Sequence, residues 1–340
     1  MRETLTDFTR CLTLLGGLFM HEPAQAQAIP KWALFNAPTG LEIYEPSGIA
    51  ILPDNRILVI QDESRAPFST FSIDSGGQAV AFAELTETAQ GGSQGPYSDL
   101  EAVALAPDGS VYATTSHSLT QSRNSEPDRE KLLRLSAEAG SETVTVQSYS
   151  GLKSAVLAAY PDLAASILSK SPKGRDGFNI EALAFDPSTG HLLIGLRGPV
   201  LNNDSLILSL ENPEAVFAGD TPQFAAEMIK LKLGQQGLRA MTYCAPLGKF
   251  LIIGQKASHS GNSQRNFHLW AWSGPSDNTL IDIDLGGIDL RKAEGLNTVH
   301  HNGHDMLLLV SDDGERKKKR QAHYLLLPLE KIAAAVQPDK

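Results

Sequence analysis

Apolar residues along this chain gather in short unbroken runs, and a similar phrase precedes five of them. In each copy, small and apolar residues surround one polar or charged position. The copies are Pro46-Ser47-Gly48-Ile49-Ala50, Leu100-Glu101-Ala102-Val103-Ala104, Ile180-Glu181-Ala182-Leu183-Ala184, Leu238-Arg239-Ala240-Met241-Thr242 and Ala293-Glu294-Gly295-Leu296-Asn297. A turn signal such as Pro107-Asp108-Gly109 separates each phrase from its run. A structural unit of roughly 55 residues is therefore repeated.

The runs predict strands that are covered on both faces. They are apolar at consecutive positions, whereas a strand with one solvated face alternates. Clear examples are Ile57 to Ile60, Leu192 to Ile194, Phe250 to Ile253 and Met306 to Val310. A third apolar segment follows in every unit, and a fourth follows in all units except the last. Repeated four-stranded sheets that pack face to face predict an all-β protein, a β-propeller of five blades, with six blades as the alternative.

The last unit lacks a fourth strand because the chain after Leu329 becomes polar and helix-like. Residues Trp32 to Phe35 precede the first repeat, and we expect them to supply that strand and close the ring. The interval between the second and third repeats is longer than the others. It contains Lys153 to Lys170, rich in Ala and Leu at helical spacing, so we predict a short helical insert over about residues 152–170 rather than a sixth blade.

The first 26 residues have the character of a secretory signal peptide. Arg2 and Arg10 precede the apolar stretch Cys11 to Met20, and small residues that suit cleavage follow. We therefore expect a signal peptide over residues 1–26, a single propeller domain over 27–340 and a periplasmic or secreted location. No stretch is long enough to predict a membrane span. Cys244 is then the one cysteine of the mature chain, and we interpret it as a core residue.

The formal charge of −10 argues against a nucleic-acid-binding surface. One exception to the acidic balance is Arg316 to Arg320, which are five consecutive basic residues. A solvated loop explains this run, and a rim that attracts phosphate is the alternative.

Candidate chemistry converges at one mouth of the propeller channel. The first strand of each blade lines the channel, and the start of this strand shares a face with the end of the antiparallel second strand. The residues at or just before the starts of the first strands are Glu45, Ser47, Asp99, Glu101, Asn179, Glu181, Arg239, Lys292 and Glu294. The residues at the ends of the second strands are Asp62, Glu63, Ser116, His117, Arg197, Gln255, Lys256, Asp312 and Asp313.

The carboxylates of this mouth are candidate metal ligands. Confined carboxylates repel one another, so they must take up protons, pair with cations or share a metal ion. The metal we consider is Ca²⁺, which prefers oxygen ligands. Its candidate ligands are Asp99, Glu101, Glu181, Glu294 and Asp312. A salt-bridge collar around Arg239 is the structural alternative, and zinc is disfavoured because His300, His301 and His304 fall in a hairpin turn.

Basic residues of the same mouth are candidate catalytic groups. Arg197, Arg239 and Lys256 offer cationic donors to a carboxylate or phosphate, and His117 is the candidate proton carrier near neutral pH. The alternative is that each base pairs with a neighbouring acid. These residues predict a small anionic ligand, such as a phosphate ester, as the partner.

Several of these motifs resemble an uncharacterised bacterial family of unknown function that is related to the phytase-like, or esterase-like, β-propellers. The motifs are Asp99-Leu100-Glu101-Ala102-Val103-Ala104, Ser116-His117-Ser118, Asn179-Ile180-Glu181-Ala182-Leu183-Ala184, Leu193-Ile194-Gly195-Leu196-Arg197-Gly198-Pro199, Gly237-Leu238-Arg239 and Ser311-Asp312-Asp313-Gly314. Family members usually carry glycine where this chain has Ala102 and Ala182. The resemblance implies a calcium-associated propeller with esterase-like activity toward phosphate esters.

Two functions of different classes follow. The first is a metal-dependent hydrolase that acts on a small anionic ester. The second is a non-catalytic exported module that binds a ligand or a protein on the propeller face. Bound metal together with turnover of a phosphoester would indicate the first, and metal without turnover the second.

Overall fold

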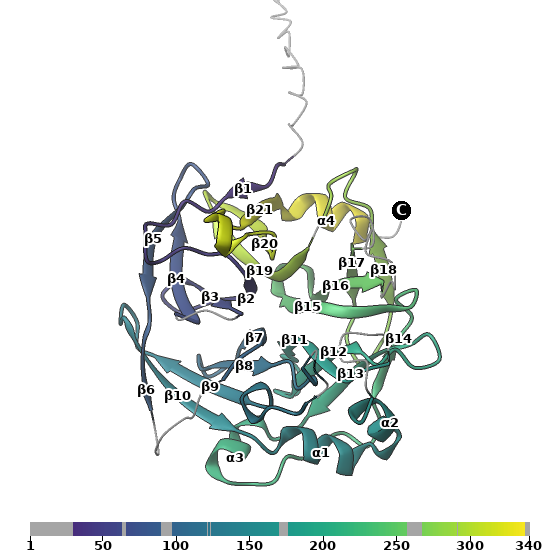
Figure 1. Cartoon of the computed structure of the whole chain (residues 1–340). Helices are drawn as coiled ribbons and strands as arrows, with labels where there is room; N and C mark the ends of the chain where they lie inside the picture. Colours follow the sequence, from purple (N-terminus) through teal and green to yellow (C-terminus); the bar gives the residue numbers. More distant parts are fainter. Residues whose placement is uncertain are drawn as a thin grey trace, which may run out of the picture.

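The computed structural model is a ring of five antiparallel β-sheets around a central axis (Figure 1). It describes residues 30–62, 66–89, 97–120, 122, 124–169, 176–256, 267–290 and 292–336. The first strands of the five sheets contact one another in sequence and the last contacts the first, so the ring is closed. This confirms the predicted five-bladed β-propeller. The proposed signal peptide, residues 1–26, and Glu63 lie outside the described residues.

Blades 1 to 4 run outward from the axis in chain order. Blade 1 contains β2 (Pro46–Ile51), β3 (Ile57–Gln61), β4 (Phe68–Ile73) and β5 (Ala79–Glu84). Blade 2 contains β7 (Leu100–Leu105), β8 (Val111–Thr115), β9 (Leu132–Ala137) and β10 (Thr143–Tyr149). Blade 3 contains β11 (Asn179–Phe185), β12 (Leu192–Gly198), β13 (Ser205–Leu210) and β14 (Ile229–Leu231). Blade 4 contains β15 (Gln236–Cys244), β16 (Lys249–Lys256), β17 (Phe267–Trp272) and β18 (Leu280–Ile283).

Blade 5 joins the two ends of the chain. It contains β19 (Ala293–His301), β20 (His304–Ser311) and β21 (His323–Pro328), and β1 (Ala33–Leu34) pairs antiparallel with β21. The expected closing strand is therefore confirmed, although only two of its residues form the ladder. Phe35 follows β1 and is fully buried, with its ring centroid 4.9 Å from that of Tyr324 and 5.2 Å from that of Phe71. This aromatic contact links blade 5 to blade 1.

One strand lies outside the predicted pattern. β6 (Thr86–Ala89) follows blade 1 and pairs in parallel with β10, so it adds a fifth strand to the outer edge of blade 2. Parallel pairing requires a long connection, and here β7, β8 and β9 lie between the two paired strands in the sequence.

The insert between blades 2 and 3 is helical, and Pro161 interrupts it. It forms α1 (Leu152–Ala159), a 3-10 turn (Pro161–Leu163) and α2 (Ala164–Ile167). The remaining helices are α3 (Pro213–Ala218), α4 (Leu329–Val336) and 3-10 turns at Pro127–Arg129, Ala245–Leu247 and Arg316–Lys318. In the part of the chain that the structure describes, no helix is long and apolar enough to cross a membrane.

The hydrophobic core lies between the blades. Five buried clusters occur, one for each pair of neighbouring blades, with α1 and α2 in the cluster of blades 2 and 3 and α4 in that of blades 4 and 5. Cys244 lies in the cluster of blades 4 and 5, and burial raises the pKa of its thiol to about 11. This agrees with its expected role as a core residue, because a thiol of such high pKa is a poor nucleophile.

Closure by β1 and Phe35 gives a stability prediction. Phe35→Ala should lower the free energy of unfolding by about 3–5 kcal/mol, because it removes a buried aromatic side chain from the contact between blades 1 and 5. Urea denaturation followed by tryptophan fluorescence measures this change. The control is Leu34→Ala, since Leu34 is 40% exposed. If both variants lowered the free energy of unfolding by the same small amount, the N-terminal segment would not hold the ring closed.

Candidate functional site

Five β-bulges place the repeated polar position of each blade at the channel. In every first strand the ladder to the second strand skips one residue. The skipped residues are Ser47, Glu101, Glu181, Arg239 and Glu294, and we call them the ring residues. A bulge sets two residues against one and redirects a side chain. The sequence repeat therefore corresponds to one backbone irregularity that is used five times.

Small residues follow the ring residues and narrow the channel beneath them. They are Gly48, Ala102, Ala182, Ala240 and Gly295. A Cβ on Gly295 would lie 3.0 Å from the Cα of Gly48 and 2.7 Å from a methyl of Val310. The cavity at this level has a volume of about 10 Å³, which is near the lower limit for one water molecule. The ring residues therefore form the floor of the mouth rather than the wall of an open pore.

Arg239 forms a salt-bridge collar with the ring residues on both sides of it. One of its guanidinium nitrogens contacts Glu181 and another contacts Glu294. Glu181 also accepts hydrogen bonds from Arg197 at 2.6 Å and from the Asn179 amide at 2.8 Å. Burial disfavours the charge on Arg197, but the Glu181 carboxylate outweighs it and raises the pKa of Arg197. The predicted collar is thus present, and it neutralises the side of the ring formed by blades 3, 4 and 5.

Two carboxyl groups, one on either side of blade 1, have no arginine partner in the described part of the chain: Glu101 on blade 2 and Asp312 at the end of β20 on blade 5. Ser47 stands between Glu294 and Glu101 in the ring order, and it carries no charge. Burial and then the neighbouring Glu181 raise the pKa of Glu101 well above its usual value, against the attraction of Arg239. Burial likewise raises the pKa of Asp312, against Lys292 and Arg239. No salt bridge to Glu101 or Asp312 is found among the described residues. The mouth is therefore polarised, with arginines on blades 3 and 4 and the unpaired carboxyls on blades 2 and 5, on either side of blade 1.

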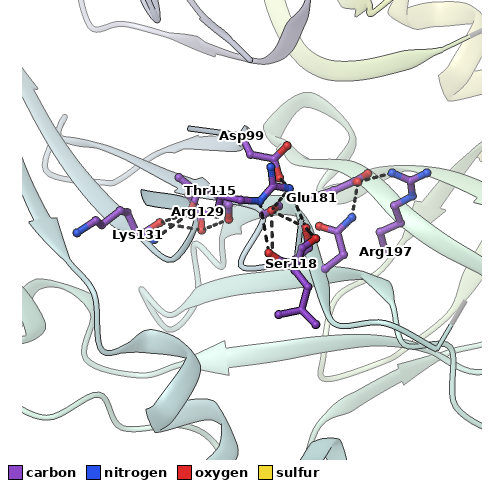
Figure 2. A network of polar contacts seen from close by, with 11 residues as sticks. Asp99, Thr115, Ser118, Arg129, Lys131, Glu181 and Arg197 are labelled. Atoms are coloured by element: carbon purple, nitrogen blue, oxygen red, sulfur yellow. Dashed lines mark hydrogen bonds and ion pairs between the residues drawn. The ribbon is translucent and has the colours of Figure 1, made fainter. Parts of the chain in front are cut away.

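Asp99 belongs to a separate buried network beside the ring (Figure 2). Arg129 forms an ion pair with Asp99 and donates a hydrogen bond to the Ser118 hydroxyl at 2.9 Å. The Ser116 and Ser118 hydroxyls lie 3.0 Å apart. Arg129 comes from the 3-10 turn in the connection between β8 and β9, outside the repeated phrase, and sequence reasoning did not identify it. Its contacts fix that connection against the mouth.

Two of the candidate catalytic residues lie apart from the collar. The His117 side chain is completely buried, and neither ring nitrogen makes a hydrogen bond to a described residue. Burial lowers the pKa of His117 to about 4, so the expected role of proton carrier near neutral pH is not supported by its surroundings. Lys256 is exposed at the end of β16, and no contact with a ring residue is found for it in the described chain.

The expected calcium ligands are not gathered into one cage. Among the described residues, no group of three or more His, Cys, Asp or Glu side chains is arranged to hold a metal ion. Glu181, Glu294 and Asp99 have arginine partners, which leaves Glu101 and Asp312 as the carboxyls able to face a cation. His300, His301 and His304 lie at the exposed tip of the β19–β20 hairpin, as expected for turn residues.

Comparison with known proteins gives a partial family match. Residues 137–220 match a family described as a protein of unknown function, DUF3616. This segment contains Glu181 and Arg197 and extends from the end of β9 to α3. No curated protein matches the chain.

Several solved structures match this chain at low sequence identity. An exo-β-1,3-galactanase from Phanerochaete chrysosporium is 10% identical with a TM-score of 0.50, and the match covers 89% of this chain and 64% of that one. An exo-β-1,3-galactanase from Clostridium thermocellum is 11% identical with a TM-score of 0.50, covering 87% and 61%. A putative oxidoreductase (glucose dehydrogenase) from Thermus thermophilus is 13% identical with a TM-score of 0.42, covering 88% and 100%. The galactanase likenesses show a propeller fold alone.

The unpaired Glu101 gives a prediction of pH-dependent stability. Because its pKa is raised in the folded protein, the folded state binds the proton more tightly, and stability falls as the pH rises above the usual range of a glutamate. Glu101→Gln removes the free-energy cost of ionising this carboxyl in the folded protein. The variant should be more stable than the wild type by about 0.5–2 kcal/mol at about pH 8, and the difference should shrink at about pH 5. Urea denaturation at both pH values measures it.

The matched control is Glu84→Gln, at an exposed position of β5. This variant should show no such pH-dependent gain. A wild type that is as stable as Glu101→Gln at the higher pH would contradict the raised pKa of Glu101.

Proposed function

We propose that the mouth of the propeller binds a small anionic ligand together with a divalent cation such as Ca²⁺. The observation that carries this proposal is the polarised mouth, with Arg197 and Arg239 on blades 3 and 4 and the unpaired Glu101 and Asp312 on blades 2 and 5. The carboxyls would repel an anion that bound alone. They are too few to supply all the ligands of a cation that bound alone. A cation bound with its anion satisfies both sides.

The carboxyl side suits a cation that carries other ligands with it. Ca²⁺ takes six to eight oxygen ligands. Glu101 and Asp312 supply only part of that number, so oxygens of the anion and of water would supply the rest. Their raised pKa values also mean that a cation must displace protons from them, which makes cation binding weaker at low pH.

The arginine side suits the anion. The Arg197 side chain is 29% exposed, and its contact to Glu181 uses one nitrogen of the guanidinium. The remaining N–H groups face a partly solvated mouth and can donate to a carboxylate or phosphate oxygen. Arg239 is buried and committed to Glu181 and Glu294, so we assign it to positioning rather than to direct contact with the ligand.

Hydrolysis of a small phosphate or carboxylic ester is the second candidate function. The raised pKa of Glu101 favours it, because a raised pKa suits a carboxyl to act as a general acid. A divalent cation, when bound, polarises a phosphoryl or carboxyl oxygen of the ester. In this role Glu101, and not His117, would keep its proton and deliver it to the leaving oxygen, so the cation would contact Asp312 and oxygens of the ester rather than Glu101.

Two further points belong to the same proposal. The resemblance of the mouth motifs to the phytase-like propellers supports an anionic ester as the ligand. The character of residues 1–26 supports action after export, in the periplasm or outside the cell.

Titration calorimetry with calcium and inorganic phosphate tests the proposal. Calcium should bind at least about tenfold more tightly in the presence of phosphate than in its absence, because the two ions share one site. Glu101→Gln and Arg197→Gln should each lower this coupling, and proton release on calcium binding should decrease in Glu101→Gln, since Asp312 remains. Glu84→Gln serves as the control and should behave like the wild type.

A panel of phosphate and carboxylic esters then separates binding from catalysis. Turnover that is lost in Glu101→Gln would establish the hydrolase, and ligand binding without turnover would establish the binding module. Equal calcium affinity with and without phosphate, unchanged in Glu101→Gln, would refute the shared site.

A further inference from the structure

A second hollow lies on the face opposite the ring residues, between blades 2 and 3. It has a volume of about 560 Å³ and is lined by the β7–β8 turn, the β11–β12 turn and the start of α3. First strands end on this face and second strands begin there, so the hollow is separated from the mouth by the length of the blades. The volume is in the range of small-molecule sites.

The floor of this hollow is aromatic. Tyr112 and Phe185 line it with their rings edge to face, at a centroid distance of 5.1 Å, and Phe217 packs on Tyr112 from another side. Ala106 and Ala218 complete the apolar lining. Tyr112 is 1% exposed and Phe185 is 8% exposed, so this floor is a closed apolar surface that suits the apolar body of a ligand.

Tyr112 carries an unpartnered polar group into the hollow. The residue is 1% exposed, yet its hydroxyl makes no hydrogen bond to any described residue. Burial raises the pKa of Tyr112 to about 12, so the hydroxyl stays neutral and is free to accept or donate a hydrogen bond. A ligand or water in the hollow can satisfy this hydroxyl.

The rim of the hollow is acidic. Asp108, Glu211 and Glu214 all line it. Arg134 lies 2.8 Å from Asp108 and 4.0 Å from Glu214, so it compensates mainly Asp108. Glu211 is exposed and forms no ion pair within the described chain. Two carboxylates are thus available to a cation above an aromatic floor.

We propose that this hollow binds a small organic cation, an amine with an apolar or aromatic body. The body lies against the apolar lining that includes Phe185, Ala106 and Ala218, and the ammonium donates to the Tyr112 hydroxyl and to the carboxylates of Glu211 and Glu214. This site is independent of the anion-binding mouth, because it differs in location and in the sign of its ligand.

Calorimetry with phenethylamine and its neutral analogue phenethyl alcohol tests this site. The amine should bind about tenfold more tightly than the alcohol, since the two differ in the charge that the rim recognises. Glu211→Gln and Tyr112→Phe should each weaken amine binding several-fold. The control is Glu227→Gln, at an exposed glutamate outside the lining of the hollow, and it should leave amine binding unchanged.

Three results would overturn the proposal. The first is no amine binding by the wild-type protein at millimolar concentration. The second is equal binding of amine and alcohol, and the third is equal weakening by Glu211→Gln and Glu227→Gln. Because the substituted glutamates are exposed, loss of folding does not explain a change in affinity, and the melting temperature of each variant verifies this.

Discussion

The contact of the Arg239 guanidinium with Glu181 and Glu294 is the interaction on which the mouth depends. Blades 3, 4 and 5 each contribute one of these residues. Each side chain can be buried with its charge because a charge of opposite sign lies against it. Removing one partner of a buried ion pair is strongly destabilising, although the pair itself adds little net stability. The collar therefore fixes the relative positions of three blades more than it strengthens the fold, and it leaves Glu101 without a counterion.

The backbone explains why these charges meet. One bulge in each first strand turns the ring residue to the channel, and a glycine or alanine follows so that neighbouring strands can approach. Serine occupies the ring position of blade 1, where a charged residue would complete the pairing. The asymmetry of the mouth thus originates in the identity of five equivalent residues on a nearly symmetric scaffold, and the same scaffold supports other chemistry on its opposite face.

Repetition determined what could be predicted from the sequence. The five phrases located the ring residues and the blade number, and the missing strand after Leu329 located the closing segment. Features outside the repeat could not be predicted in this way. Arg129 comes from a connection of irregular path, and the burial of His117 depends on how that connection folds back. The arginine partners of Asp99, Glu181 and Glu294 depend on rotamers that spacing does not determine, so spacing alone could not distinguish paired from unpaired carboxylates.

A crystal structure from crystals grown with calcium and phosphate tests the polarised mouth most directly, with the anomalous signal of calcium to locate the cation. We expect a calcium peak on the side of Glu101 and Asp312, a phosphate between it and Arg197, and the contacts of Arg239 to Glu181 and Glu294 intact. A mouth without either ion, or calcium bound where Arg239 now meets Glu181, would contradict the polarised mouth.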